Sequence, residues 1–329
     1  MKLNYLGEKL FYGALWLFAG ALSASSHLSH LNVSSVFNLN DKVVYGEDDR
    51  EMVEDHLNEM LVEKAQSVAA HIAKSKLDLD EGGLFYTLNS DRTLGTSLGL
   101  CEEERFVEEL NPARCSGFLI GEDILATAGH CLNEASCDAH YWVFGFHDLK
   151  TTFFIEDVYS CQDIIETTNT YSREDPDYAV IRLDRVVNGR DPLEFRVEGV
   201  VADDATLAVI GHPSGISMKI DDGGHVRGEE GNAPEEYFVA DLDTFGGNSG
   251  SPVFDLETGL IEGILVRGEK DYNYDYENSC RLVNTLEDGE GRGEDVQRIT
   301  SIPLEWDPVE PIEPVDPEEE EPVDPNHGL

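Results

Sequence analysis

GLIEGILV, residues 259–266, is one of several short β-rich runs that are separated by Gly, Asp and Asn. The others are CSGFLI (115–120), YWVFGF (141–146), YAVIRL (178–183) and TLAVIG (206–211). Many short strands with turn signals and few helical windows between them predict an all-β fold, a barrel or a sandwich, from about Cys115 onward.

One window before these runs has a helical pattern. Its apolar residues recur near helical spacing and are Val53, Leu57, Leu61, Val68 and Ile72. The pattern predicts an amphipathic helix over residues 51–75.

The composition limits the classes of partner. The chain has 329 residues, with Lys+Arg 23 against Asp+Glu 67 and a net charge of −44. Nucleic acid and anionic membranes are therefore not expected as partners, because a phosphate polymer needs clustered Lys and Arg. The hydrophobic content of 40% is enough for a core, and the acidity keeps the protein soluble in a salty medium.

The N-terminus reads as a targeting segment. Lys2 and Lys9 precede an apolar run over residues 10–22, and this run is followed by small residues at 23–26. Such a run is shorter than the roughly 20 residues that span a bilayer but suits a signal peptide. Residues 1–24 are therefore predicted to be a signal peptide, with an uncleaved anchor as the alternative. The mature protein is expected to be secreted or periplasmic, and not bound to a membrane.

The C-terminus is low in complexity. Residues 305–325 carry many acidic side chains and no Lys or Arg, and Pro308, Pro311, Pro314 and Pro317 recur at every third position. This composition cannot bury a core, so residues 304–329 are expected to be a disordered acidic tail.

The six cysteines are an even set in an exported chain, so three disulfides are expected. They are Cys101, Cys115, Cys131, Cys137, Cys161 and Cys280. Zinc is the competing interpretation, but no CxxC or HExxH spacing is present. The acidic loops DLDEGG (78–83) and DDGG (221–224) could offer carboxylates to calcium, but neither completes an EF-hand pattern, so solvated acidic loops are the favoured interpretation. No metal or other cofactor is therefore expected.

Three motifs in the β-rich region carry nucleophilic chemistry. ATAGHC contains His130, DYAVIRL opens with Asp177, and GGNSGSPVF contains Ser249. A Ser hydroxyl needs an imidazole to remove its proton, and the imidazole needs a carboxylate to fix its tautomer. Because glycines flank Ser249 on both sides, the backbone can make a tight turn that points amide hydrogens at an oxyanion. We assign this oxyanion hole to the N–H groups of Gly247 and Ser249.

With these motifs the chain resembles the chymotrypsin-like serine proteases, especially the bacterial branch that contains the glutamyl endopeptidases. The resemblance covers roughly residues 43–302, and the order His130, Asp177, Ser249 is the chymotrypsin order. It implies two six-stranded antiparallel β-barrels in a protease domain over 43–303, with the helical segment before them. It also implies that His130 acts as general base and then general acid, that Asp177 orients it, and that Ser249 forms an acyl-enzyme.

The resemblance implies one disulfide, between Cys115 and Cys131, because the family ties its catalytic His loop in this way. If residues 141–146 and 152–160 form a hairpin, Cys137 and Cys161 fall symmetrically about its turn. Cys101 and Cys280 are then left to pair with each other.

Proteolytic processing is expected near Lys42. VVYGEDDR, residues 43–50, resembles the mature N-terminal text of bacterial glutamyl endopeptidases, which makes residues 25–42 a candidate pro-segment of a zymogen. Trypsin-like zymogens pair the new amine with an Asp directly before the nucleophile. Asn248 occupies that position here, so that ion pair cannot form.

The resemblance also places the substrate pocket. Asp243 lies six residues before Ser249, at the offset where trypsin-like enzymes carry the Asp that attracts Arg or Lys. Glutamyl endopeptidases have a His where this chain has Leu265, which disfavours Glu preference. Arg267 is a possible partner that would cancel the charge of Asp243. Thr244 and Gly268 complete the predicted pocket.

The sequence thus predicts a monomeric, exported serine endopeptidase that acts on protein or peptide substrates and prefers Arg or Lys before the cut. Three alternatives remain. The first is a Glu-specific or broad-specificity endopeptidase of the same fold. The others are a catalytically silent binding protein and an esterase that uses the same triad.

Overall fold

The computed structural model describes residues 43–169, 172–173 and 175–303. The expected signal peptide (1–24), pro-segment (25–42) and acidic tail (304–329) lie outside the described residues.

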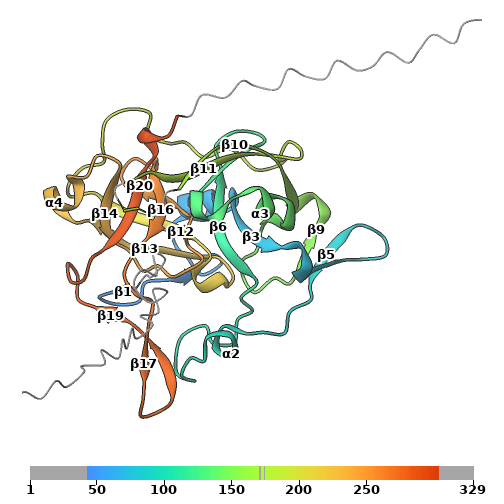
Figure 1. Ribbon diagram of the computed structural model, residues 1–329, viewed down its shortest axis with the longest axis horizontal. Coiled ribbons are helices and arrows are strands. Elements are labelled where there is room, and N and C mark those ends of the chain that lie inside the picture. The colour runs from blue at the N-terminus through green and yellow to red at the C-terminus, as the bar shows by residue number, and fades with distance from the viewer. Residues whose placement is uncertain (1–42, 170–171, 174, 304–329) are drawn as a thin grey trace, which may run out of the picture. The chain divides into compact units, whose positions relative to one another are not determined.

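Six antiparallel strands close into a first barrel, in the order β10–β11–β7–β6–β3–β8 (Figure 1). Trp142 and Phe144 fill its interior and are fully buried. The strands are β3 (Val68–Ala73), β6 (Ala113–Leu119), β7 (Ile124–Thr127), β8 (His140–Phe144), β10 (Val158–Asn169) and β11 (Asp177–Leu183).

Six further strands form a second barrel, in the order β12–β15–β16–β20–β14–β13, which the pairing of β13 with β12 closes. Phe238 and Leu265 lie in its core. The strands are β12 (Thr206–Gly211), β13 (Lys219–Val226), β14 (Tyr237–Asp241), β15 (Pro252–Asp255), β16 (Ile261–Arg267) and β20 (Glu294–Arg298). The short β2 (Glu51–Met52) adds to the edge of β13. The predicted pair of six-stranded antiparallel barrels is confirmed.

The remaining strands and helices are short and lie outside the two barrel sheets. Strand β1 (Val44–Tyr45) runs parallel to β19 (Thr285–Leu286). A hairpin is formed by β17 (Tyr272–Asp275) and β18 (Cys280–Val283). A third small sheet consists of β4 (Leu77–Leu79), β5 (Phe85–Leu88) and β9 (Thr152–Phe154). The α-helices are α1 (Glu59–Ala65), α2 (Leu94–Leu98), α3 (Glu134–Ala139) and α4 (Gly228–Asn232). Short 3-10 helices cover 74–76, 129–131, 155–157, 213–215 and 299–301.

The two barrels pack against each other through an apolar interface. One buried cluster joins Phe118 and Ile124 of the first barrel to Phe254 and Ile264 of the second. Truncation of a buried Phe to Ala typically costs about 3–5 kcal/mol. This interface therefore fixes the relative position of loops that arise from both barrels.

The helix predicted over residues 51–75 is wrong in its extent. Within this range only Glu59–Ala65 are α-helical, while Val68–Ala73 form β3. Strand β3 pairs with β6 on one side and β8 on the other, and Val68, Ala69, Ala70 and Ile72 are all fully buried. A strand that is apolar on both faces loses the alternation of period two, so its sequence is easily mistaken for a helix.

Three disulfides are present, and they join the pairs expected from the sequence: Cys101–Cys280, Cys115–Cys131 and Cys137–Cys161. The first joins two segments that are 179 residues apart. It connects the turn after α2 to the start of β18 on the second half of the chain.

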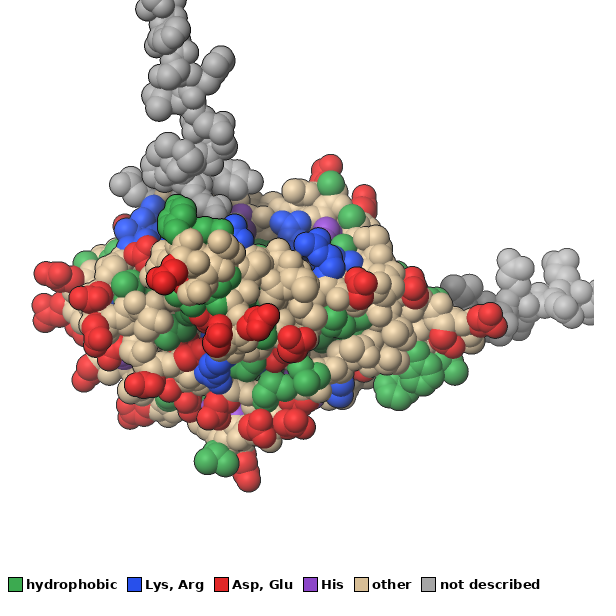
Figure 2. Space-filling view, turned by 90° about the horizontal axis from the view of Figure 1, so that it is seen from below, with side chains coloured by type: hydrophobic (Ala, Val, Ile, Leu, Met, Phe, Trp, Pro, Cys, Tyr) green, Lys and Arg blue, Asp and Glu red, His purple; other side chains and the backbone are tan. Residues whose placement is uncertain are grey.

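The face of the molecule in Figure 2 is strongly acidic, with many Asp and Glu side chains and few Lys and Arg. Within the described part of the chain, no helix has the length and apolar character that crossing a membrane requires.

Candidate active site

His130 lies in the 3-10 turn Gly129–Cys131 that follows β7. Gly129 allows this turn to approach the neighbouring strand, because a Cβ there would lie 2.0 Å from the carbonyl oxygen of Thr168. The Cys115–Cys131 disulfide ties the other side of the turn to β6. The imidazole is thus carried by a backbone that is held on both sides.

Asp177, the first residue of β11, binds His130 through both carboxylate oxygens. Its Oδ1 accepts the backbone N–H of His130 at 2.9 Å, and its Oδ2 lies 2.8 Å from Nδ1 of the imidazole. The backbone N–H of Asp177 donates to Oε1 of Gln297 at 2.9 Å, which anchors this end of β11 to the second barrel. A carboxylate can only accept, so Nδ1 carries the proton and Nε2 presents a lone pair.

The charge of Asp177 is maintained although the residue is 5% exposed. Burial alone would raise the pKa of Asp177. Hydrogen bonds from His130 and the charges of His130 and Arg267 outweigh that effect and hold the pKa below its ordinary value. The ionised form is the one that can orient a neutral imidazole and stabilise a charged one.

Nε2 of His130 is buried and has no hydrogen-bond partner among residues 43–169, 172–173 and 175–303. A buried polar atom without a partner is uncommon in folded proteins. In unliganded enzymes the bond between nucleophile and base is often long and tightens when substrate binds. The imidazole is therefore placed to accept a proton from a group that arrives at Nε2.

Ser249 lies on a loop of the second barrel that packs against the His130 turn. Its carbonyl oxygen accepts the N–H of Ser116 on β6 at 2.8 Å and lies 3.6 Å from Sγ of Cys131. The next residue, Gly250, has φ +90°, and a Cβ there would lie 2.3 Å from Oγ1 of Thr127. The structure thus brings the sequence around Ser249 against the residues that carry His130.

Gly247 has a conformation that requires glycine. Its φ is +107°, and an added Cβ would lie 2.4 Å from the carbonyl oxygen of His212. Oγ of Ser116 donates to the carbonyl oxygen of Gly247 at 2.9 Å and accepts the N–H of His212 at 3.0 Å, so Ser116 links this loop to the turn at 211–215 that follows β12. Within the described residues, the N–H groups of Gly247 and Ser249 donate no hydrogen bond. Two such donors on one turn are suited to an oxyanion.

The predicted pocket residues separate into different environments. Asp243 is buried and accepts the N–H of Tyr45 at 2.8 Å and the N–H of Asp49 at 2.9 Å, so it holds the segment that begins near Val43. Burial raises the pKa of Asp243 to about 7. Leu265 packs in the core of the second barrel. Both side chains are thus engaged in contacts within the protein.

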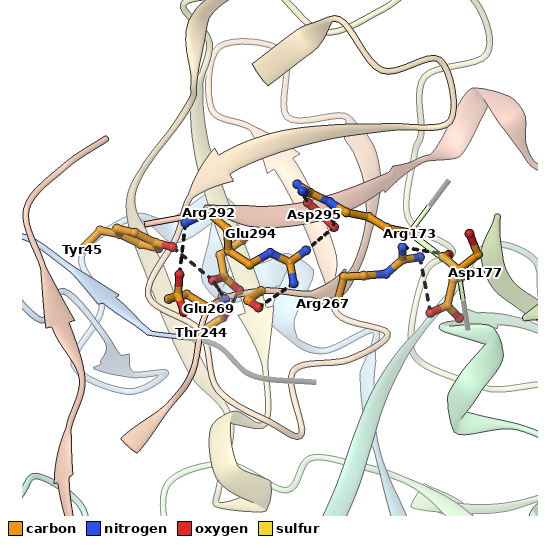
Figure 3. A network of polar contacts seen from close by, with 11 residues as sticks. Tyr45, Arg173, Asp177, Thr244, Arg267, Glu269, Arg292, Glu294 and Asp295 are labelled. Atoms are coloured by element: carbon orange, nitrogen blue, oxygen red, sulfur yellow. Dashed lines mark hydrogen bonds and ion pairs between the residues drawn. The ribbon is translucent and has the colours of Figure 1, made fainter. Parts of the chain in front are cut away.

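Arg267 pairs with a residue other than the one considered from the sequence. Its Nη2 lies 3.7 Å from Oδ2 of Asp177, and its Nη1 donates to the carbonyl oxygen of Ser172 at 3.2 Å (Figure 3). The pairing with Asp243, which the sequence left open, is therefore not the ion pair that Arg267 makes. The offset along the sequence could not show this, because a long side chain at the end of β16 can reach either barrel.

Glu294, the first residue of β20, was missed by sequence reasoning and joins the two remaining pocket residues. Its Oε2 accepts the hydroxyl of Thr244 at 2.6 Å, and a Cβ on Gly268 would lie 1.9 Å from the same oxygen. Its Oε1 accepts the N–H of Glu269 at 3.0 Å (Figure 3). The only sequence signal is the acidic pair Glu294–Asp295 at the start of the last strand, which the acidity of the whole chain conceals.

One cluster of potential metal ligands lies at His130. Cys115, His130 and Cys131 are close enough to share a metal ion, but both cysteines belong to a disulfide and have no thiolate to offer. In the loop at 78–83, the carboxylate of Asp80 accepts the N–H groups of Gly82, Leu84 and Phe85. That carboxylate shapes a turn, as Asp often does.

Residues 115–264 match the family model of the trypsin-like peptidase domain. No curated protein matches the chain significantly. The solved structures that are similar include a Glu endopeptidase in complex with MPD, at 19% identity and TM-score 0.46, over 79% of this chain and 94% of that one. The Rv3671c protease of M. tuberculosis in its active form is 15% identical, with TM-score 0.42, over 80% and 88% of the chains. The VesB protease of Vibrio cholerae is 13% identical, with TM-score 0.44, over 79% and 65%.

Proposed function

Because the chain carries a trypsin-like peptidase domain and is a chymotrypsin-like serine endopeptidase, we propose that it cleaves peptide bonds through His130, Asp177 and Ser249. The observation that carries this assignment is the His130–Asp177 pair, whose second imidazole nitrogen is left without a partner beside the Ser249 loop.

The proposed reaction begins when Oγ of Ser249 attacks the carbonyl carbon of the scissile bond and Nε2 of His130 takes the hydroxyl proton. The N–H groups of Gly247 and Ser249 stabilise the oxyanion that forms. His130 then gives its proton to the departing amine, which leaves an acyl group on Ser249. A water molecule, activated by His130 in the same way, hydrolyses the acyl-enzyme and restores the hydroxyl.

Replacement of Ser249 by Ala tests the proposal. We expect the variant to keep its fold, because the backbone carbonyl rather than the hydroxyl of Ser249 makes the contacts with Ser116 and Cys131. Peptide hydrolysis should be lost, and a serine-directed phosphonate should label the wild type and not the variant. Peptidase activity near the wild-type level in the variant would end the assignment. A wild type that folds but neither cleaves nor reacts would instead support a binding protein.

The substrate preference that we propose is for Arg or Lys before the cut. Support comes from Glu294, whose buried carboxylate lies against Thr244 and Gly268, and from Asp243 directly before Thr244. Arg267 makes its ion pair with Asp177, so it does not cancel the charge of Asp243. A cationic substrate side chain would be attracted to such a site.

A mixed peptide library, digested by wild type and by Ser249→Ala, measures this preference by mass spectrometry. Cuts after Arg and Lys that are absent from the control are expected, and Asp243→Asn and Glu294→Gln then show which carboxylate selects them. Cuts after Glu would favour the Glu-specific alternative. Cuts after apolar residues would favour the broad-specificity alternative. Hydrolysis of simple esters without any peptide cleavage would indicate an esterase.

We also propose export followed by processing after Lys42. Support comes from the way the segment beyond Lys42 is integrated into the fold. Val43 is fully buried, its carbonyl oxygen accepts the N–H of Thr244 at 3.1 Å, and Tyr45 donates to Asp243. N-terminal sequencing of active enzyme should find Val43 first, whereas a start near Ser25 would contradict the proposal.

A further inference from the structure

Arg267 brings a second cation to the carboxylate of Asp177. The residue ends β16 and is 5% exposed. Its Nη2 lies 3.7 Å from the same Oδ2 that lies 2.8 Å from Nδ1 of His130. Figure 3 shows the guanidinium pointing from the second barrel toward Asp177 on the first. When His130 is protonated, one carboxylate oxygen therefore has two positive groups beside it.

The neighbours of Arg267 explain why it turns toward Asp177. A guanidinium cannot lose its proton, so a buried one needs an anionic partner. The acid directly opposite Arg267 in the register of β16 and β20 is Asp295. Asp295 is already engaged by Arg173 at 2.7 Å and by Arg292 at 2.5 Å. Asp177 is the acid with which Arg267 pairs.

We propose that Arg267 is a positioning residue for the catalytic dyad: it holds the Asp177 carboxylate and, by its charge, opposes protonation of His130 in the resting enzyme. The inference rests on the proposed triad. General-base catalysis requires a neutral imidazole, so a fixed positive charge on the same carboxylate extends activity to lower pH.

Among the described residues, the other charged groups near Asp177 are one cation and three acids, and the cation is already paired with one of the acids. They are Arg173 and Asp175 in the loop before it, Glu166 on β10, which accepts the Tyr178 hydroxyl at 2.8 Å, and Asp295 on β20. Arg173 binds Asp295 through two hydrogen bonds of 2.9 and 2.7 Å. Strand β7, on the other side of β11, has the sequence ILAT and brings no charge. Arg267 is thus the cation that the fold directs at the dyad.

The distances give the size of the effect. Nη2 of Arg267 and Nδ1 of His130 are both bound to one oxygen, at 3.7 and 2.8 Å, and are therefore within about 6.5 Å of each other. At an effective dielectric constant of about 20, two unit charges at this distance shift a titration by about one to two pH units. Removal of the charge should move the acid limb of the pH–rate profile upward by about that amount.

The test is the pH dependence of kcat/KM, from about pH 4 to pH 9, for peptide hydrolysis by the processed enzyme with no further truncation. Arg267→Gln and Arg267→Met remove the charge, and the second keeps an unbranched side chain that packs where the stem of Arg267 does. Arg267→Lys retains the charge. Arg182→Gln is the matched control, because Arg182 lies on the same strand as Asp177 but pairs with Asp123 at 2.9 Å.

We expect an upward shift of the acid limb by about one unit or more in Arg267→Gln or Arg267→Met, which is about a tenfold loss of activity at the acid end relative to the plateau. The limb should be restored in Arg267→Lys and unmoved in Arg182→Gln. If the acid limb stays in place while the plateau of kcat/KM falls in both Arg267→Gln and Arg267→Met, the role of Arg267 is purely structural and the inference is overturned. Peptidase activity that survives Ser249→Ala would instead refute the triad itself, so the two failures can be told apart.

Discussion

Replacement of Asp177 by Asn should reverse the hydrogen-bond direction at His130. In the wild type, Oδ1 of Asp177 accepts the backbone N–H of His130 and Oδ2 faces Nδ1. An Asn side chain has one oxygen and one NH₂ group. The backbone N–H fixes the oxygen at the Oδ1 position, so the NH₂ group faces Nδ1 and forces it to become an acceptor. Nε2 must then carry the proton and cannot take one from Ser249.

The expected loss in kcat is about 10⁴-fold, the size that the wrong imidazole tautomer produces in enzymes with this triad. It corresponds to about 5.5 kcal/mol of transition-state stabilisation. Active-site-titrated enzyme should be assayed with a peptide substrate, and unfolding in urea should show whether the fold is retained. A variant that is folded and retains more than about a tenth of wild-type kcat would refute the assigned tautomer and the role of Asp177.

The remaining predictions concern one backbone position and two kinds of buried titratable group. Gly247→Ala should lower kcat by about 10²–10³-fold, since its Cβ would collide with the carbonyl of His212 and displace an oxyanion donor; an unchanged kcat would remove Gly247 from the oxyanion hole. Burial lowers the pKa of His212 to about 3 and that of His71 well below its ordinary value. In the unfolded chain these imidazoles take up protons at a higher pH than in the folded chain. The free energy of unfolding should therefore fall as pH drops below about 6.5, by about 3 kcal/mol at pH 4 for His212 alone. A free energy of unfolding in urea that does not change over this range would contradict the prediction. Burial raises the pKa of Asp243 to about 7, so its ionisation should destabilise the fold as pH rises from about 4 through 7. Asp243→Asn should remove that part of the pH dependence, and an unaltered pH–stability curve for the variant would argue that Asp243 is ionised at lower pH.

Much of the architecture could be predicted because its determinants are local. The two barrels follow from short apolar runs between turn residues, and Val68–Ala73 was misassigned because burial on both faces removes the pattern that distinguishes a strand. The turn that carries His130 and the glycine at 247 are encoded within a few residues of each site. Their geometry could therefore be expected before the long-range contacts were known.

The partners of long charged side chains could not be predicted in the same way. Arg267 was placed on the correct strand, but whether it pairs with Asp177 or Asp243 depends on how two barrels meet. Asp243 was located by its offset from Ser249, and its hydrogen bonds to Tyr45 and Asp49 depend on a segment nearly 200 residues earlier in the chain. Glu294 has no sequence context that separates it from the many other acidic residues.

The Cys101–Cys280 disulfide changes what a backbone cut would do to this enzyme. The connection between the barrels, from the end of β11 at Leu183 to the start of β12 at Thr206, includes Val197, which is 80% exposed. Exposed connecting segments are preferred sites of proteolysis, so one molecule of a protease can cut another there. Because the disulfide encloses the whole connection, the two pieces of a nicked molecule would remain one covalent unit. The apolar interface would then keep the two barrels packed together, so a nicked molecule is expected to stay assembled in an oxidising medium and to separate only after reduction.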